Sequence, residues 1–308
     1  MIDHLIPILA GTLAAATPLV FAGLGELVAE KSGVINLGVE GMILIGAIAG
    51  FAFATQTGGG AGAGLIAGAV AGTLAATLFA ILSLSLGANQ AAAGLALTIF
   101  GIGLSAFIGQ SFVSYSLPGL KPWDIPLLSD IPVIGRILFH QDWVVYLSWV
   151  VALAVAWVLA KTRLGLLLKA VGESPESAHA IGYPVIAIRY GAVLFGGAMA
   201  GIAGAYLSTV YTPLWVQNMS AGRGWIAVAL VVFATWKPGR LMLGAYLFGG
   251  MTILQLHAQG LGIRVPSQLM SAIPYAATVL VLVLISRDRK LLQLNLPASL
   301  GKSFMPGG

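Results

Sequence analysis

Apolar residues occur along this chain in runs of about 20, separated by short segments that hold most of its charges. A helix needs about 20 mostly apolar residues to cross the hydrocarbon core of a bilayer. The pattern therefore predicts an all-α, polytopic membrane protein with about nine transmembrane helices, within a range of about eight to ten. The expected spans cover residues 5–27, 34–55, 63–86, 90–110, 143–160, 189–211, 222–236, 239–257 and 269–286.

Two of these spans depart from a plain apolar run. The seventh, 222–236, is short, and the second, 34–55, carries glycines and polar atoms near its start. Backbone that is not helical is tolerated at membrane depth only where protein or a cavity surrounds it. We expect either span to be a discontinuous or re-entrant helix.

The composition excludes a protein that folds in water. Of the 308 residues, 58% are hydrophobic and 8% are charged, and the mean hydropathy is +0.97. Soluble domains carry about 25% charged residues, so a soluble globular protein, a disordered chain and a nucleic-acid-binding domain are all excluded. With no cysteine and four histidines that lack metal-ligand spacing, we expect neither disulfides nor a metal site.

Lysine and arginine are unevenly divided between the two alternating sets of loops. By the positive-inside rule the richer set is cytoplasmic. It includes the tail, 287–308, so the C-terminus is expected inside and, with an odd number of spans, the N-terminus outside. Of the 15 basic residues, eleven belong to this set: Lys31, Lys161, Arg163, Lys169, Arg189, Lys237, Arg240, Arg287, Arg289, Lys290 and Lys302. The opposite set holds Lys121, Arg136, Arg223 and Arg264.

Two connections are long. The external one, 111–142, contains four prolines, which argue against one continuous helix. The cytoplasmic one, 161–188, contains Ser174 followed by Pro175, a capping residue and then proline at the first helical position. This pattern predicts a short helix over 175–181 that ends at Gly182, outside the membrane.

Small residues recur every four positions in two spans. Gly60, Gly64, Gly68 and Gly72 form one row, and Ala192, Gly196, Ala200 and Gly204 form another. Small residues let helix backbones approach closely in lipid. A helix that slides or hinges there is one interpretation, and tight static packing is the one we favour.

Polar residues inside the spans are few. Glu40 is expected a short way into the second span, where a buried acid is costly. It either faces a ligand or a gate, or accepts hydrogen bonds from backbone amides of a broken helix near Gly38 and Gly41, and we favour the second. Glu26 is expected near the cytoplasmic boundary, and Asn89 is expected to cap the fourth span.

The chain shows no engine of its own for transport. Gly301-Lys302-Ser303 lacks the earlier glycine of a phosphate-binding loop, because position 296 is Leu. An ion-coupled transporter usually carries intramembrane ionisable groups, which are scarce here. A subunit driven by a separate ATPase needs instead a rigid cytoplasmic element to receive force, which the helix at 175–181 supplies. A scaffold protein would explain neither feature.

Three stretches resemble the permease subunits of ATP-binding cassette (ABC) importers, in the group that takes up nucleosides, simple sugars and branched-chain amino acids. The resemblance covers nearly the whole chain, which implies a single permease domain over 1–308. Residues 25–42 (GELVAEKSGVINLGVEGM) and 87–98 (GANQAAAGLALT) are similar to the nucleoside-type branch that works with a basic-membrane-protein lipoprotein. Residues 170–182 (AVGESPESAHAIG) and 196–204 (GGAMAGIAG) are shared across the wider group.

The resemblance implies a transport subunit of the bacterial inner membrane that is not an enzyme. ATP and Mg²⁺ would be held by the partner ATP-binding subunits, with no cofactor on this chain. A second, different permease subunit and an extracytoplasmic substrate-binding protein would complete the importer. Nucleosides are the expected substrates, with ribose-type sugars as the alternative.

The resemblance also implies two sets of site residues. The helix at 175–181 would dock on the ATPase through Gly172, Glu173, Ser174, Pro175, Ala178, Ala180 and Gly182. The family often has Asn where Ser174 stands, and His179 is less usual, which affects side-chain detail at the dock. The expected pathway or gate positions are Glu26, Asn36, Glu40, Asn89 and Thr98.

Overall fold

The computed structural model describes residues 2–126, 128–129, 131–260 and 295–305, together with isolated positions between 269 and 283. In this part of the chain, seven helices are long and apolar enough to cross a membrane, which confirms an all-α polytopic fold. Most of the expected ninth span, 269–286, and half of the tail, 287–308, lie outside the described residues. The seven helices are α1 (Ile2–Lys31), α2 (Val39–Thr57), α3 (Gly60–Ala80), α4 (Gln90–Gly109), α6 (Trp143–Lys161), α9 (Val185–Tyr206) and α11 (Pro238–Gly260).

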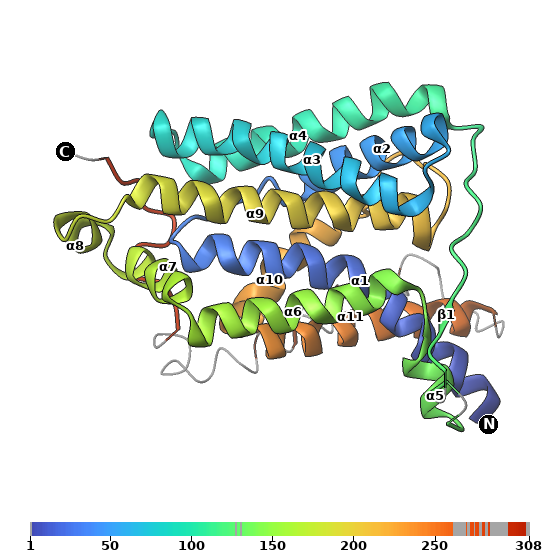
Figure 1. Cartoon of the computed structure of the whole chain (residues 1–308). Helices are drawn as coiled ribbons and strands as arrows, with labels where there is room; N and C mark the ends of the chain where they lie inside the picture. Colours follow the sequence, from blue (N-terminus) through green and yellow to red (C-terminus); the bar gives the residue numbers. More distant parts are fainter. Residues whose placement is uncertain are drawn as a thin grey trace.

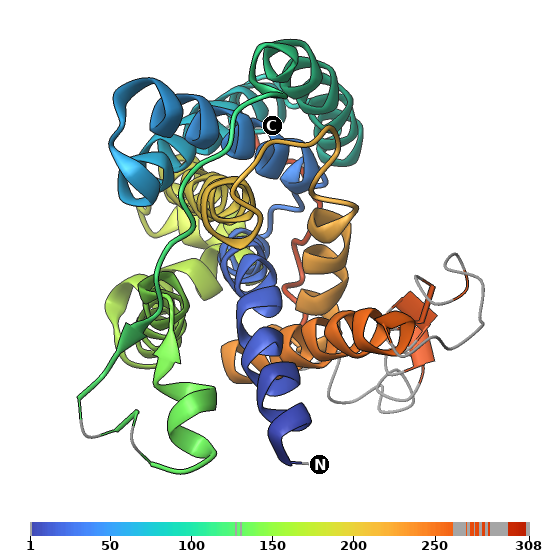
Figure 2. The same ribbon diagram turned by 90° about the vertical axis from the view of Figure 1, so that its right-hand side faces the viewer.

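Helices such as α6 and α9 run along a common direction, while α11 crosses it, and the bundle has two distinct ends (Figures 1 and 2). The short helix α8 (Pro175–Ala180) and the C-terminal segment lie at one end, which we call the α8 end. The N-terminus and α5 (Ile134–Leu138) lie at the opposite end. Short π-helical turns, Ile81–Ser85 and Leu207–Tyr211, extend α3 and α9.

Helices α1 and α9 occupy the centre of the bundle (Figure 2). Helix α9 packs against α1, α2 and α3, while α1 packs against α9 and α11 and also contacts α6 and α10 (Arg223–Phe233). In α1, every residue from Leu13 to Glu30 is buried except Ala14, which is partly exposed. A helix that is buried on all sides is enclosed by other helices. The remaining helices therefore surround a central pair.

Helix α10 is too short to span a bilayer. Its 11 residues extend about 16 Å at 1.5 Å per residue, roughly half of a hydrocarbon core about 30 Å thick. Helix α2 runs without a break from Val39 to Thr57, but it begins only after seven non-helical residues that follow the end of α1 at Lys31. We refer to residues 32–38 as the α1–α2 connection. Neither α2 nor α10 is broken within its own length; each follows non-helical backbone, and in this sense we call them the interrupted helices.

The proline-rich connection, 111–142, does not form one continuous helix. After the 3₁₀ turn Gln110–Phe112 the chain continues to β1 (Trp123–Asp124), α5 and β2 (His140–Gln141). The two strands pair antiparallel, with Trp123 opposite Gln141. Asp142 then caps α6 by accepting hydrogen bonds from the amides of Val144 and Val145.

The rows of small residues bring helix backbones into direct contact. Gly68 and Gly72 of α3 face Gly201 and Gly197 of α9, and a Cβ built on Gly201 would lie 2.0 Å from the carbonyl oxygen of Gly68. The other row behaves alike, since a Cβ on Gly204 would lie 1.9 Å from the carbonyl oxygen of Ile43. A Cβ built on Gly64 or Gly196 would also have neighbours within 4 Å. A Cβ built on Gly60, at the start of α3, would have none, so this glycine does not take part in the packing.

Replacing Gly201 by alanine should weaken the contact between α3 and α9. A methyl group there overlaps a backbone carbonyl, which cannot rotate away, and overpacking of this kind costs about 1–3 kcal/mol. Gly191→Ala is the matched control, because Gly191 is on the same helix and nothing lies within 4 Å of the place that its new methyl group would take. Thermal unfolding in detergent should show a lower midpoint for Gly201→Ala alone; equal midpoints would contradict the packing.

Candidate functional site

The cytoplasmic connection expected at 161–188 contains two consecutive helices at the α8 end, α7 (Arg163–Glu173) and α8. Ser174 lies between them in an extended conformation, and its Oγ accepts a hydrogen bond from the Ser177 amide at 3.2 Å. Pro175 occupies the first helical position. The short helix predicted from this pattern is present, and it ends at Ala180, one residue before the predicted limit. Gly182 follows with φ +93°, a conformation that suits glycine.

One face of α8 is packed against its own chain. Ala178 is 3% exposed and belongs to a small apolar cluster with Val171 of α7 and Val185 of α9. Pro175 is buried as well. The helix is therefore fixed to the bundle by its inner face.

The opposite face of α8 is open. Among the expected docking residues, Glu173, Ala180 and Gly182 are exposed, whereas Gly172, Pro175 and Ala178 are buried. Ile181, which is 73% exposed, stands among them and was missed by the sequence reasoning. Its signal was an isolated large apolar side chain in the most polar internal stretch. Single exposed apolar residues are common, so Ile181 is of interest only for its position directly after α8.

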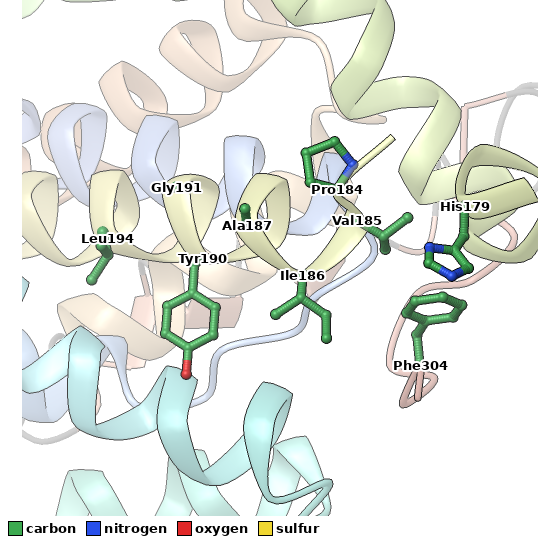
Figure 3. Close-up of a pocket in the computed structure, with 9 residues that line it drawn as sticks. All are labelled: His179, Pro184, Val185, Ile186, Ala187, Tyr190, Gly191, Leu194 and Phe304. Carbon is green, nitrogen blue, oxygen red and sulfur yellow. The ribbon is translucent and has the colours of Figure 1, made fainter. Parts of the chain in front are cut away.

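A cavity of about 730 Å³ lies beside α8. Figure 3 shows His179 of α8 and Phe304 of the C-terminal segment with their rings near each other at one end of the cavity, while Tyr190 and Leu194 of α9 point toward it further along. The two rings meet edge to face, with centroids 5.6 Å apart. The lining is almost entirely apolar, and its members come from α8, the first turns of α9 and Phe304.

Gly172 lets the end of α7 approach the end of α1. A Cβ on this residue would lie 2.2 Å from the carbonyl oxygen of Lys31. Any side chain there would push α7 away from the α1–α2 connection. Gly172 therefore acts inside the chain rather than on an exposed docking face.

The expected pathway residues mostly hold backbone rather than face a cavity. Glu26 accepts a hydrogen bond from the Asn36 amide, and the Asn36 side chain accepts one from the Gly38 amide, both at 2.9 Å. Thr98 of α4 donates to the carbonyl of Leu37 at 2.9 Å. Three of the five residues thus fix the α1–α2 connection. Asn89 accepts from the Ala92 amide and caps α4, as predicted.

Glu40 joins the two interrupted helices. Its Oε1 accepts hydrogen bonds from the Ser220 hydroxyl at 2.6 Å and the Gly222 amide at 2.9 Å. Its Oε2 accepts from the Gly224 amide at 2.6 Å. A carboxylate at a helix N-terminus satisfies free amides and complements the helix dipole. Glu40 belongs to the first turn of α2 and caps the first turn of α10.

This arrangement matches the structural role that we favoured for Glu40, but the partners differ from those expected. The amides belong to residues 222 and 224, about 180 positions further along the chain, and not to the neighbourhood of Gly38 and Gly41. The local sequence could suggest free amides near Glu40. It could not indicate that the start of α10 supplies the donors.

The two carboxylates predict different responses to the same substitution. Glu40→Gln places an amide nitrogen against donors, because both oxygens of Glu40 accept hydrogen bonds. Glu26→Gln keeps one acceptor for Asn36, and the second oxygen of Glu26 has no hydrogen-bond partner in the described residues. Loss of hydrogen bonds to a charged group costs about 1.5–3 kcal/mol each.

We therefore expect Glu40→Gln to lower the unfolding midpoint clearly more than Glu26→Gln does. Hydrogen exchange should also accelerate at the amides of residues 222–226 in the Glu40 variant alone. Equal protection of these amides in both variants would rule out the cap.

Comparison with known proteins identifies the family. The family described as "Branched-chain amino acid transport system / permease component" matches residues 8–285. The putative glucose ABC transporter permease protein TsgC13 of Haloferax volcanii is 40% identical, over 96% of this chain and 97% of its own length. The nucleoside ABC transporter permease protein NupC of Lactococcus lactis is 34% identical (90% and 91% covered). The guanosine ABC transporter permease protein NupQ of Bacillus subtilis is 32% identical (89% and 90%). These matches extend over nearly the whole chain, which therefore belongs to the permease family of ABC transporters.

Proposed function

We propose that this chain is the transmembrane subunit of an ATP-driven nucleoside importer, and that a separate ATP-binding subunit docks on α8. The observation that carries this proposal is a capped, exposed helix whose inner face is fixed to the bundle through Ala178. Such an element can receive force without deforming. ATP and Mg²⁺ then belong to the partner subunit, and this chain needs no nucleotide site of its own.

The proposed sidedness places the α8 end in the cytoplasm. Lys161, Arg163 and Lys169 lie on or beside α7, and Lys31 ends α1 nearby. This concentration of positive charge supports a cytoplasmic position in the cell membrane. The C-terminus is then inside, and the N-terminus, at the opposite end of the bundle, is outside. An extracytoplasmic binding protein would deliver substrate at that outer end.

Of the two buried carboxylates expected in the pathway, Glu26 has one oxygen without a hydrogen-bond partner in the described residues and Glu40 has none, so Glu40 does not support an ion-coupled mechanism. Both oxygens of Glu40 are occupied by donors within the chain, so this carboxylate is not free to bind a coupling ion. Energy from ATP on another subunit agrees with the family. We propose a second, different permease subunit as the partner that completes the pathway.

For the substrate we propose nucleosides, with neutral sugars as the alternative. The relatives named for nucleoside and guanosine transport support the first, and the relative named for glucose transport supports the second. Both classes are small, polar and uncharged. They fit a bundle whose polar side chains mostly bind its own backbone.

The proposal can be tested by uptake in proteoliposomes that contain this chain, the second permease, the ATP-binding subunit and the binding protein. We expect accumulation of radiolabelled guanosine that requires ATP and persists with ionophores present. Excess unlabelled adenosine should compete, and excess glucose should not. Uptake that follows an ion gradient without ATP would refute the importer, and competition by glucose alone would assign the sugar substrate.

A substitution at the end of α8 tests the docking surface. Gly182→Asp adds a charged side chain where nothing lies within 4 Å, which should repel the ATP-binding subunit; the positive φ of Gly182 also makes any side chain there strained. Gly58→Asp is the matched control, since Gly58 also has a positive φ and open surroundings but ends α2 at the opposite end of the bundle. We expect loss of co-purifying ATP-binding subunit, and of uptake, for Gly182→Asp only. Normal co-purification of that variant would place the dock elsewhere.

A further inference from the structure

The C-terminal segment 295–305 crosses the α8 end of the bundle (Figure 1). It is connected there to three separate parts of the chain. Ser299 donates from its amide to the carbonyl of Gly172, which lies near the end of α7, at 2.9 Å. Gly301 donates to the carbonyl of Gly33 in the α1–α2 connection at 3.1 Å. Near its end, Phe304 contacts His179 of α8.

Arg189 is at the centre of these contacts. It lies in the second turn of α9 and is 1% exposed. Its guanidinium donates from Nε to the carbonyl of Ser32, from Nη1 to the carbonyl of Lys302 and from Nη2 to the hydroxyl of Ser299, each at 3.1 Å. One side chain thus joins α9, the α1–α2 connection and the C-terminal segment.

The arrangement around Arg189 is costly to build. A buried guanidinium loses its hydration, and in the described residues it forms no ion pair with a carboxylate. Its hydrogen bonds go to carbonyl and hydroxyl oxygens, and the Glu176 carboxylate of α8 favours its charge from beyond ion-pair distance. Gly33 is held at φ +89°, and a Cβ on it would lie 2.8 Å from Nη2 and 2.5 Å from the Ser299 hydroxyl. Burying this guanidinium costs free energy that an apolar contact between the same segments would not cost. Its three hydrogen bonds, unlike an apolar contact, fix the orientation of the segments relative to one another.

The contacts continue from α8 to the middle of the bundle. From His179 they pass through Phe304 to the C-terminal segment, and through Arg189 to the α1–α2 connection. The connection leads directly into α2, whose first turn holds α10 through Glu40. The steps between segments are hydrogen bonds or a ring contact, and the backbone joins them within the C-terminal segment and from Ser32 to Glu40.

We infer that Arg189 is a positioning residue for ATP-driven transport, and that Arg189 with segment 295–305 forms a link that transmits movement of α8 to α2 and α10. This inference rests on the proposed docking of an ATP-binding subunit at α8. It adds a specific route by which that subunit acts on the interrupted helices. Coupling between distant sites requires such a physically connected element that both sites can bias.

The first experiment compares transport with ATP hydrolysis in the proteoliposomes described above. Arg189→Met leaves an unbranched side chain of similar shape but removes the three N–H groups that donate hydrogen bonds. Lys302→Met is the control, because it removes one positive charge from the exposed side chain of the same segment while the backbone carbonyl that Arg189 contacts remains. We expect Arg189→Met to bind the ATP-binding subunit and hydrolyse ATP, with about tenfold less guanosine moved per ATP, as for a typical coupling free energy. Lys302→Met should match the unmodified chain.

A second variant guards against a simple loss of folding. Phe304→Ala removes the ring contact with His179. Because Phe304 is only half-buried, this substitution should lower the stability of the fold less than a change at the buried Arg189. Because the chain has no cysteine, one spin label can be placed at Ser177→Cys on α8 and a second, in the same molecule, at Thr57→Cys at the end of α2; Glu176 is left in place because its carboxylate acts on Arg189. In the unmodified link the distance between labels should change when ATP is added, and in Phe304→Ala the change should be lost while the starting distance is kept.

The outcomes separate the two proposals. No ATP-dependent uptake by the unmodified complex would refute the proposed function itself. With normal uptake in that complex, an unchanged ratio of guanosine to ATP in Arg189→Met and an unchanged distance response in Phe304→Ala would refute the link alone. A proportional fall of uptake and hydrolysis in both variants would also refute it, because it would show that the segment only stabilises the fold.

Discussion

The structure depends on how one stretch of non-helical backbone is satisfied inside the bundle. Residues 32–38 are enclosed, with Ser32, Val34 and Asn36 no more than 1% exposed. A peptide N–H or C=O group that has no hydrogen-bond partner costs roughly several kcal/mol where water is excluded. Side chains from α1, α4 and α9 supply the missing partners, namely Glu26, Gln90, Thr98 and Arg189. The start of α2 is fixed by these contacts, and α10 is fixed in turn by Glu40.

This constraint explains why most polar residues of the spans do not line a pathway. A side chain that accepts from a buried amide cannot also bind a solute strongly without releasing that amide. Glu26, Asn36 and Thr98 were attractive as pathway residues because polar groups are rare in spans. The same rarity follows equally from the need to satisfy the α1–α2 connection, and the geometry supports that second cause.

Features that depend on a few neighbouring residues could be predicted from the sequence. Apolar runs located the seven long helices, and Ser174 with Pro175 located α8, because hydropathy and capping act over a few residues. Contacts between distant segments could not be read in this way. Glu40 pairs with amides about 180 residues away, and Arg189 pairs with a carbonyl over 100 residues away in either direction. A single sequence carries no record of which segments a fold brings together, so these partners needed the structure.

The contacts divide the bundle into two mechanical parts. Helices α3 and α9 touch through backbone atoms along Gly68, Gly72 and Gly201, and such close-packed surfaces do not deform gradually. The first turns of α2 and α10 instead meet through one carboxylate and three donors, a junction that can move as a unit while its hydrogen bonds stay intact. If an ATP-binding subunit docks at α8 as we propose, the glycine contacts between α3 and α9 would resist its force. The force would instead move α2 and α10, because a helix that begins after non-helical backbone can tilt without moving a preceding helical half.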